Sequence, residues 1–157
     1  MFENEINIYH HIGQSMFNAL PEEWDSAYFY LMMLSEKRDC VYEEGYFMNG
    51  VNCDFNTNKI DGEYEDAKCA DAFFSLYKLM KKDESDIPWN KARFELKPDG
   101  SFDMKFKYDE DFAFYKGLDL GKKQESDLFD ALLDSGIGTI IKSWEGLPED
   151  FDRYWLK

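Results

Sequence analysis

The chain has 157 residues, of which 33 are acidic and 18 are basic, so its formal net charge at pH 7 is −15. This charge repels nucleic-acid phosphates and anionic membrane surfaces, which argues against either as a partner. Hydrophobic residues make up 44% and aromatic residues 18% of the chain, which excludes a disordered acidic tail and favours one folded domain.

The first third of the chain has one helical pattern followed by strand patterns. Apolar residues at helical spacing predict a helix over Asn4–Leu20, which Pro21 ends. The run Ser26–Leu34 is apolar on both alternating faces, which predicts an interior strand whose second face is rich in tyrosine. The segments that follow are expected to be its hairpin partner, a turn and a short third strand: Asp39–Met48, Asn49–Gly50 and Val51–Phe55.

A polar loop then precedes a second helix and a second hairpin. The loop is expected over Asn56–Gly62 and the helix over Glu65–Lys81. The predicted buried stripe of this helix is Ala70, Phe73, Phe74, Tyr77 and Met80. Alternating apolar residues predict two strands joined by a Pro-Asp-Gly turn: Lys91–Lys97 and Ser101–Tyr108.

The last third begins with three consecutive acids, Asp109–Asp111, for which no helix is predicted, and a helix is expected only further along the chain. After a loop over Gly117–Gln124, Ser126 is expected to cap a short helix that Gly136 and Gly138 stop. Thr139–Trp144 fits a strand or a helix, and Glu149–Trp155 fits a terminal helical turn. The order of elements predicts an α+β fold with a mostly antiparallel sheet of about five strands and helices on one face.

The cysteines and the N-terminal residues indicate a cytoplasmic protein. Cys40, Cys53 and Cys69 are odd in number and lack paired spacing, as expected of reduced thiols. The residues after Met1 lack the basic region of a signal peptide. No apolar run approaches the roughly 20 residues that span a bilayer.

Patterns that would support catalysis are weak, and we predict no catalytic residues and no cofactor. The histidines are His10 and His11, which are adjacent on the first predicted helix and therefore point about 100° apart. Neither is predicted to activate a nucleophile, because that needs a histidine within hydrogen-bond reach of it. A hydrolase that uses a pair of carboxylates stays an alternative, although pairs are inevitable among so many acids.

One loop partly matches a calcium-binding loop. Asp54, Asn56, Asn58 and Glu65 have the spacing of ligand positions 1, 3, 5 and 12 of an EF-hand. Lys59 stands where that loop needs glycine, and a strand pattern precedes the loop in place of a helix. We therefore expect a polar turn without a metal, and keep a calcium-binding module as a further alternative.

Two acidic clusters lie beside aromatic residues. The segment Asp39–Asp71 holds nine acids and two lysines, and the triplet Asp109–Asp111 is flanked by Tyr108, Phe112, Phe114 and Tyr115. Aromatic rings give rigid contact area and carboxylates bind Arg and Lys, so such a mixture suits a surface for a basic protein. The alternative is that the rings fill the core and the acids form a solvated rim that keeps the protein soluble.

The sequence resembles the YezG-like antitoxin family over about residues 4–112. The resemblance is carried by two motifs in the right order and spacing: Leu20-Pro21-Glu22-Glu23-Trp24 with Ala27, Tyr28 and Tyr30, and Pro88-Trp89 through Phe102 to Asp111. It implies an α+β fold and one domain over residues 1–157. Residues 114–157 depart from the family pattern and form an atypical C-terminal extension.

The resemblance also implies a function. Members of this family are immunity proteins that bind and neutralise a secreted or contact-delivered bacterial toxin, often a nuclease, inside the producing cell. A basic toxin would suit the acidic surface, which speeds encounter with a positively charged partner. The residues expected at the interface are Glu43, Glu44, Asp109, Glu110, Asp111 and Tyr115.

Overall fold

A computed structural model describes residues 4–35, 39–57, 59–60, 63–64 and 68–156, and the chain divides into two compact units. The first spans Met1–Lys107 and the second Tyr108–Lys157. The division therefore falls one residue before the end of the second predicted hairpin. That both units belong to one domain with an extension from residue 114 stays a prediction.

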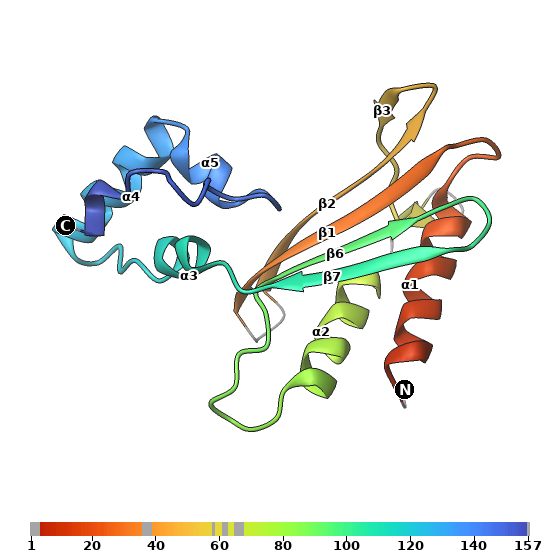
Figure 1. The fold of residues 1–157 in the computed structure, drawn as a ribbon, viewed down its shortest axis with the longest axis horizontal. Coiled ribbons are helices and arrows are strands. Elements are labelled where there is room, and N and C mark those ends of the chain that lie inside the picture. The colour runs from red at the N-terminus through yellow and green to blue at the C-terminus, as the bar shows by residue number, and fades with distance from the viewer. Residues whose placement is uncertain (1–3, 36–38, 58, 61–62, 65–67, 157) are drawn as a thin grey trace. The chain divides into compact units, whose positions relative to one another are not determined.

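The first unit is built on a five-stranded antiparallel sheet in the order β3-β2-β1-β6-β7 (Figure 1). Its strands are β1 (Ser26–Ser35), β2 (Asp39–Met48), β3 (Val51–Cys53), β6 (Lys91–Leu96) and β7 (Phe102–Lys107). β1 pairs with β2 on one side and β6 on the other, as expected of a strand that is apolar on both faces. Both predicted hairpins are confirmed.

The turn between β2 and β3 shows how local sequence sets this connection. Asn49 has φ 53° and Gly50 has φ 79°, so both residues occupy the left-handed region. Asn and Gly tolerate this conformation best, and two such residues in succession match the right-handed twist of the flanking strands. The Asn49 N–H also donates to a carboxylate oxygen of Asp25 at 2.8 Å.

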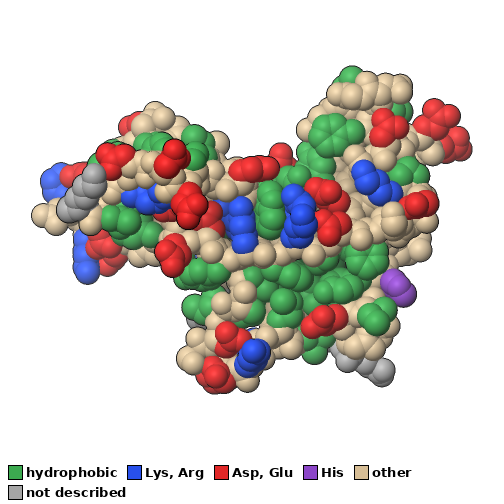
Figure 2. All heavy atoms as spheres, in the orientation of Figure 1, with side chains coloured by type: hydrophobic (Ala, Val, Ile, Leu, Met, Phe, Trp, Pro, Cys, Tyr) green, Lys and Arg blue, Asp and Glu red, His purple; other side chains and the backbone are tan. Residues whose placement is uncertain are grey.

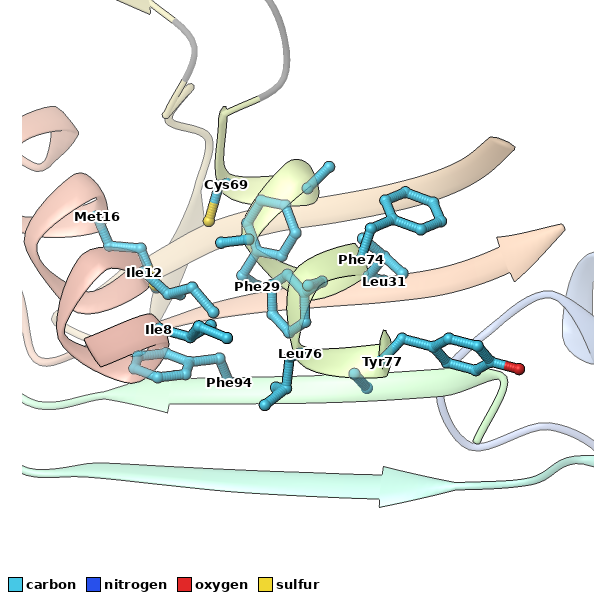
Figure 3. Close-up of a cluster of buried hydrophobic side chains, with 14 of the residues drawn as sticks. Ile8, Ile12, Met16, Phe29, Leu31, Cys69, Phe74, Leu76, Tyr77 and Phe94 are labelled. Atoms are coloured by element: carbon cyan, nitrogen blue, oxygen red, sulfur yellow. The ribbon is translucent and has the colours of Figure 1, made fainter. Parts of the chain in front are cut away.

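Two helices, α1 (Glu5–Ala19) and α2 (Lys68–Met80), lie together on one face of this sheet (Figure 1). The Asn4 side chain caps α1 by accepting from the Asn7 N–H at 3.0 Å. The apolar spacing that predicted a helix over Asn4–Leu20 includes Ile8, Ile12 and Met16, and all three are fully buried. Figure 3 shows these side chains meeting those of α2 and the sheet, including Phe29, Leu31, Cys69, Phe74, Leu76, Tyr77 and Phe94.

The segment predicted as a loop holds more regular structure than expected. A short strand within it, β4 (Lys59–Ile60), pairs antiparallel with β5 (Glu63–Tyr64), which directly follows the predicted loop. The prediction failed here because Asn, Asp and Gly signal turns, and strands this short carry no periodicity. The first three residues expected in α2 lie outside the described residues.

The second unit is helical, with α3 (Glu110–Lys116), α4 (Lys123–Asp134), α5 (Ile137–Ile141) and a terminal 3-10 turn, η1 (Tyr154–Leu156). The predicted cap at Ser126 is wrong, because α4 begins three residues earlier, after Lys122. Gly136 follows α4 as expected, with φ 83°, but Gly138 lies inside α5. Together the units give five α-helices and a five-stranded antiparallel sheet among the described residues, which confirms the α+β class.

Candidate functional site

The six residues expected at an interface lie in both units. Glu43 and Glu44 are on β2 of the first unit, whereas Asp109, Glu110, Asp111 and Tyr115 belong to α3 and its cap in the second. Glu43 and Glu44 are neighbours on a strand, so their side chains point to opposite faces of the sheet. The register confirms this, because Glu44 is paired with the core residue Phe29 and Glu43 with Tyr30.

Glu44 faces the helix side of the sheet and is engaged within the first unit. Its carboxylate accepts from the Thr57 backbone N–H at 3.2 Å and from the Thr57 hydroxyl at 2.9 Å. Burial raises the pKa of Glu44, and the two bonds from Thr57 oppose that shift. Thr57 is itself buried. This pair therefore ties the segment after β3 to the middle of β2.

Glu43 is exposed on the other face, beside a group of aromatic rings. We call Tyr28, Tyr30 and Phe47 the aromatic face. The Tyr28 and Tyr30 rings stack with centroids 4.6 Å apart, and Phe47 lies 5.9 Å from Tyr28. An exposed carboxylate beside rings is the mixture that the sequence predicted for a protein-binding surface.

Gly45 makes the arrangement of the aromatic face possible. A Cβ at this position would lie 2.5 Å from the Tyr28 hydroxyl and 3.0 Å from the Cys53 carbonyl oxygen. Glycine therefore lets Tyr28 lie across β2 and reach Asn52 on β3, whose amide nitrogen donates to the tyrosine oxygen at 3.2 Å. Sequence reasoning missed this contact, although a glycine inside a strand is the signal that would have indicated a close approach.

The acidic triplet opens α3. Asp109 is its N-cap, and one carboxylate oxygen accepts from the Phe112 N–H at 3.2 Å. Glu110 and Asp111 occupy the first turn, where negative charge interacts favourably with the helix dipole. Glu110 is exposed, whereas Asp111 is only 13% exposed. The triplet therefore helps to start a helix, and Glu110 is its outward-facing member.

Asp111 forms a two-pronged ion pair with Arg153, a residue 42 positions later. Arg153 Nε and Nη2 donate to the two carboxylate oxygens, each at 2.9 Å. The same guanidinium donates to the carbonyl oxygens of Pro148, Glu149 and Phe151 at 2.7 to 3.1 Å. The hydrogen bonds that Arg153 donates to Asp111 raise the pKa of Arg153. This arrangement, the Arg153 latch, holds the C-terminal segment to α3 within the second unit.

Tyr115 is buried, with 3% of its surface exposed. Its ring stacks on Phe129 of α4 with centroids 4.8 Å apart. Burial, and secondarily the charge of Asp130, raises the pKa of Tyr115. A Cβ on Gly138 would lie 2.7 Å from its hydroxyl, so this glycine allows α5 to approach α3. Tyr115 thus packs three helices of the second unit together.

The described residues offer little for nucleophilic or metal chemistry. His10 is exposed and His11 half-buried on α1, as expected of adjacent helical residues. Burial, and secondarily the charge of Glu44, raises the pKa of Cys69 well above its ordinary value, which keeps this thiol protonated. Among the residues that the structure describes, no three His, Cys, Asp or Glu side chains are grouped to hold a metal ion.

The calcium-like loop is only partly described. Asn58 and Glu65, two of its four matching positions, lie outside the described residues. β3 precedes the loop, where an EF-hand has a helix. Within the same described part of the chain, no helix has the length and apolar character needed to cross a membrane.

Most of the chain matches a known protein family. Residues 6–123 match the family model described as "Immunity protein YezG-like". The matched region runs from α1 through both hairpins and α3 to the first residue of α4. It therefore covers more than half of the chain and includes all six residues expected at an interface. No curated protein matches the chain.

Proposed function

Because the chain belongs to the YezG-like immunity protein family, we propose that it binds a cognate bacterial toxin and neutralises it through direct protein–protein contact. The observation that carries this proposal is the family match over both hairpins and the start of the helical unit. We assign the protein no reaction of its own. Its place of action would be the cytoplasm of the toxin-producing cell.

We further propose that the toxin domain is basic, as nucleases commonly are. A net charge of −15 supports this choice, because it attracts a positively charged partner and speeds association. Acidic side chains are spread over the visible surface of both units (Figure 2). Nucleases bind phosphates through basic grooves, so a carboxylate-rich protein can compete for the same surface.

The six candidate residues divide into two roles in this proposal. Glu43 and Glu110 are exposed, so they would touch the toxin directly. Glu44, Asp109 and Asp111 already bond within the protein, to Thr57, Phe112 and Arg153, and Tyr115 is buried. These four would act by holding β2 and α3 in position. Of the aromatic face beside Glu43, Phe47 is exposed and Tyr30 is half-buried, so these two rings would supply apolar contact area, while the buried Tyr28 supports them.

Charge reversal tests these assignments. Glu43→Lys and Glu110→Lys are each titrated against the toxin domain encoded beside this gene, and both should slow association. High salt should lower the association rate of the wild type and reduce the difference in rate between the wild type and each variant. Glu84→Lys is the matched control, because Glu84 is an exposed acid on neither β2 nor α3. Unchanged association rates would remove Glu43 and Glu110 from the interface. Reversing Asp109 or Asp111 is less informative, since it breaks a helix cap or the Arg153 latch.

A further inference from the structure

The outer strand of the sheet, β7, has main-chain groups that point away from the sheet. Met33 N–H donates to the Asn90 carbonyl at 2.8 Å, and Lys97 N–H donates to the Ser101 carbonyl at 2.9 Å. In an antiparallel ladder, the main-chain groups of successive residues point alternately to the two neighbouring strands. The main-chain groups of Arg93 and Glu95 therefore form hydrogen bonds with β7, and those of Ala92 and Phe94 form hydrogen bonds with β1. The residues of β7 whose N–H and C=O groups point outward are therefore Phe102, Met104 and Phe106.

The two faces of β7 differ in character. On the helix side, Phe102 is 42% exposed, and Met104 and Phe106 are half-buried. On the other side, Asp103 and Lys105 are exposed. Figure 2 shows a row of acidic and basic side chains along the sheet with a broad apolar area beneath it. β7 therefore offers an apolar row, a charged row and outward main-chain groups.

The charged row is divided into an acidic end and a basic end. Asp103 is paired with Glu95 on β6, and Lys105 is paired with Arg93. Like charges thus lie opposite each other, and diagonal bridges relieve this only in part, with Arg93 Nη2 lying 3.4 Å from Asp103. An added strand that reverses the order of charges would place an acid against the basic end and a base against the acidic end.

We propose that β7 pairs antiparallel with β7 of a second copy of this chain, in the register that places Met104 opposite Met104. In this register Asp103 of each copy faces Lys105 of the other in a non-hydrogen-bonded pair, where side chains are closest. Phe102 of each copy faces Phe106 of the other on the apolar side. The outward groups of Phe102, Met104 and Phe106 then supply the ladder hydrogen bonds.

Neighbouring registers are disfavoured by the same charges. Sliding one strand by two residues one way places Asp103 opposite Asp103, and sliding it the other way places Lys105 opposite Lys105. A lysine on an edge strand usually discourages pairing, but here each copy presents the acid that neutralises it. The pattern is thus complementary to itself, which selects a second copy over an unrelated strand.

The test is the self-association of the full chain, measured by sedimentation equilibrium at 0.15 M salt. Screening at this ionic strength confines the repulsion between two acidic copies to about 8 Å. Asp103→Lys and Lys105→Asp should each raise the dimer dissociation constant by about tenfold or more, because like charges then meet at both pairs. The double variant Asp103→Lys/Lys105→Asp should restore it to within about threefold of wild type. Glu84→Lys and Lys97→Asp are off-edge controls of the same charge change.

A backbone variant gives an independent readout. Met104→Pro removes an outward N–H that the β6–β7 ladder does not use, so it should abolish the dimer and leave cooperative thermal unfolding intact. Lys105→Pro, whose N–H faces β6, is the contrasting variant and should unfold at a lower temperature. A wild-type chain that is monomeric at about 100 μM would overturn the proposal, as would a dimer that survives both single charge changes. Toxin binding is measured separately and does not decide this result.

Discussion

Glu43 and Glu44 show how much the surroundings decide the role of a residue. The first is exposed beside the aromatic face, and the second is half-buried with bonds from Thr57. The strand predicted over Asp39–Met48 places two adjacent glutamates on opposite faces, but the sequence does not show which of these faces the helices cover. Of these two predicted interface residues, Glu43 can therefore contact a partner, whereas Glu44 stabilises the fold.

Replacing Glu44 with glutamine tests the effect of its burial. Because burial raises the folded-state pKa above 4.5, the folded state binds the proton more tightly than the unfolded chain does. The stabilisation that comes from this tighter proton binding is fully present below pH 4.5, and it is lost as the pH rises through the raised pKa of Glu44. Glu44→Gln does not ionise and keeps an oxygen for the Thr57 N–H. Its free energy of unfolding relative to wild type should therefore increase as the pH rises from 4.5, and then level off.

The measurement for Glu44→Gln is urea unfolding across this pH range. Glu43→Gln, on the exposed face of the same strand, is the matched control. An equal pH dependence in both variants would contradict the role of burial. Glu44→Ala should instead lose about 1–3 kcal/mol, because it leaves the buried Thr57 donors without an acceptor.

At Gly45, the addition of a single carbon atom is expected to lower the stability of the fold. Gly45→Ala would place a Cβ against the Tyr28 hydroxyl and against main chain of β3, so we expect a loss of about 1–3 kcal/mol in urea unfolding. Gly13→Ala is the control, because a Cβ there meets only Phe94 and Leu96 at 3.7 and 3.9 Å and alanine favours the helix. Equal stability of Gly45→Ala and wild type would show that Tyr28 does not need to lie across β2.

At the scale of elements, the helices and strands with a regular apolar pattern could be predicted from the sequence. The stripes of α1 and α2 and the alternation of β6 and β7 follow directly from burial on one face. No helix is predicted from the sequence over α3, because its acids are interpreted there as a cluster that follows a strand. Asp109 as cap with Glu110 and Asp111 in the first turn is a typical helix start, so the signal was present. The ion pair of Arg153 could not be predicted from the sequence, because its partner Asp111 is 42 residues away.

The Arg153 latch gives a prediction for the C-terminal segment. Arg153→Lys keeps the charge but loses the fork that bonds both oxygens of Asp111, so residues 149–156 should exchange amide hydrogens faster. The expected loss of local stability is about 1–3 kcal/mol. Lys123→Ala is the control, because its ion pair with Asp127 is exposed and contributes little. Unchanged exchange in Arg153→Lys would show that the latch does not hold the segment.

At the scale of the whole molecule, the first unit has a hydrophobic core of its own. Every residue of the hydrophobic core around α1, α2 and the sheet belongs to Met1–Lys107. We therefore expect a fragment of residues 1–107 to unfold cooperatively on heating, followed by circular dichroism. A fragment without a cooperative transition would show that the first unit needs the second, and would favour the single domain expected from the sequence.

Charge also acts at this scale, because −15 is a property of the whole surface rather than of one site. A strongly negative surface both keeps the protein soluble and attracts a basic partner. Neutralisation of a toxin is the observation that distinguishes these two roles. The most direct measurement is a titration of this protein against the toxin encoded beside it, following the activity of the toxin. Our account predicts that activity falls to background at about one equivalent, since a stable complex of this kind is typically nanomolar or tighter. Full toxin activity in the presence of excess protein at micromolar concentration would contradict it.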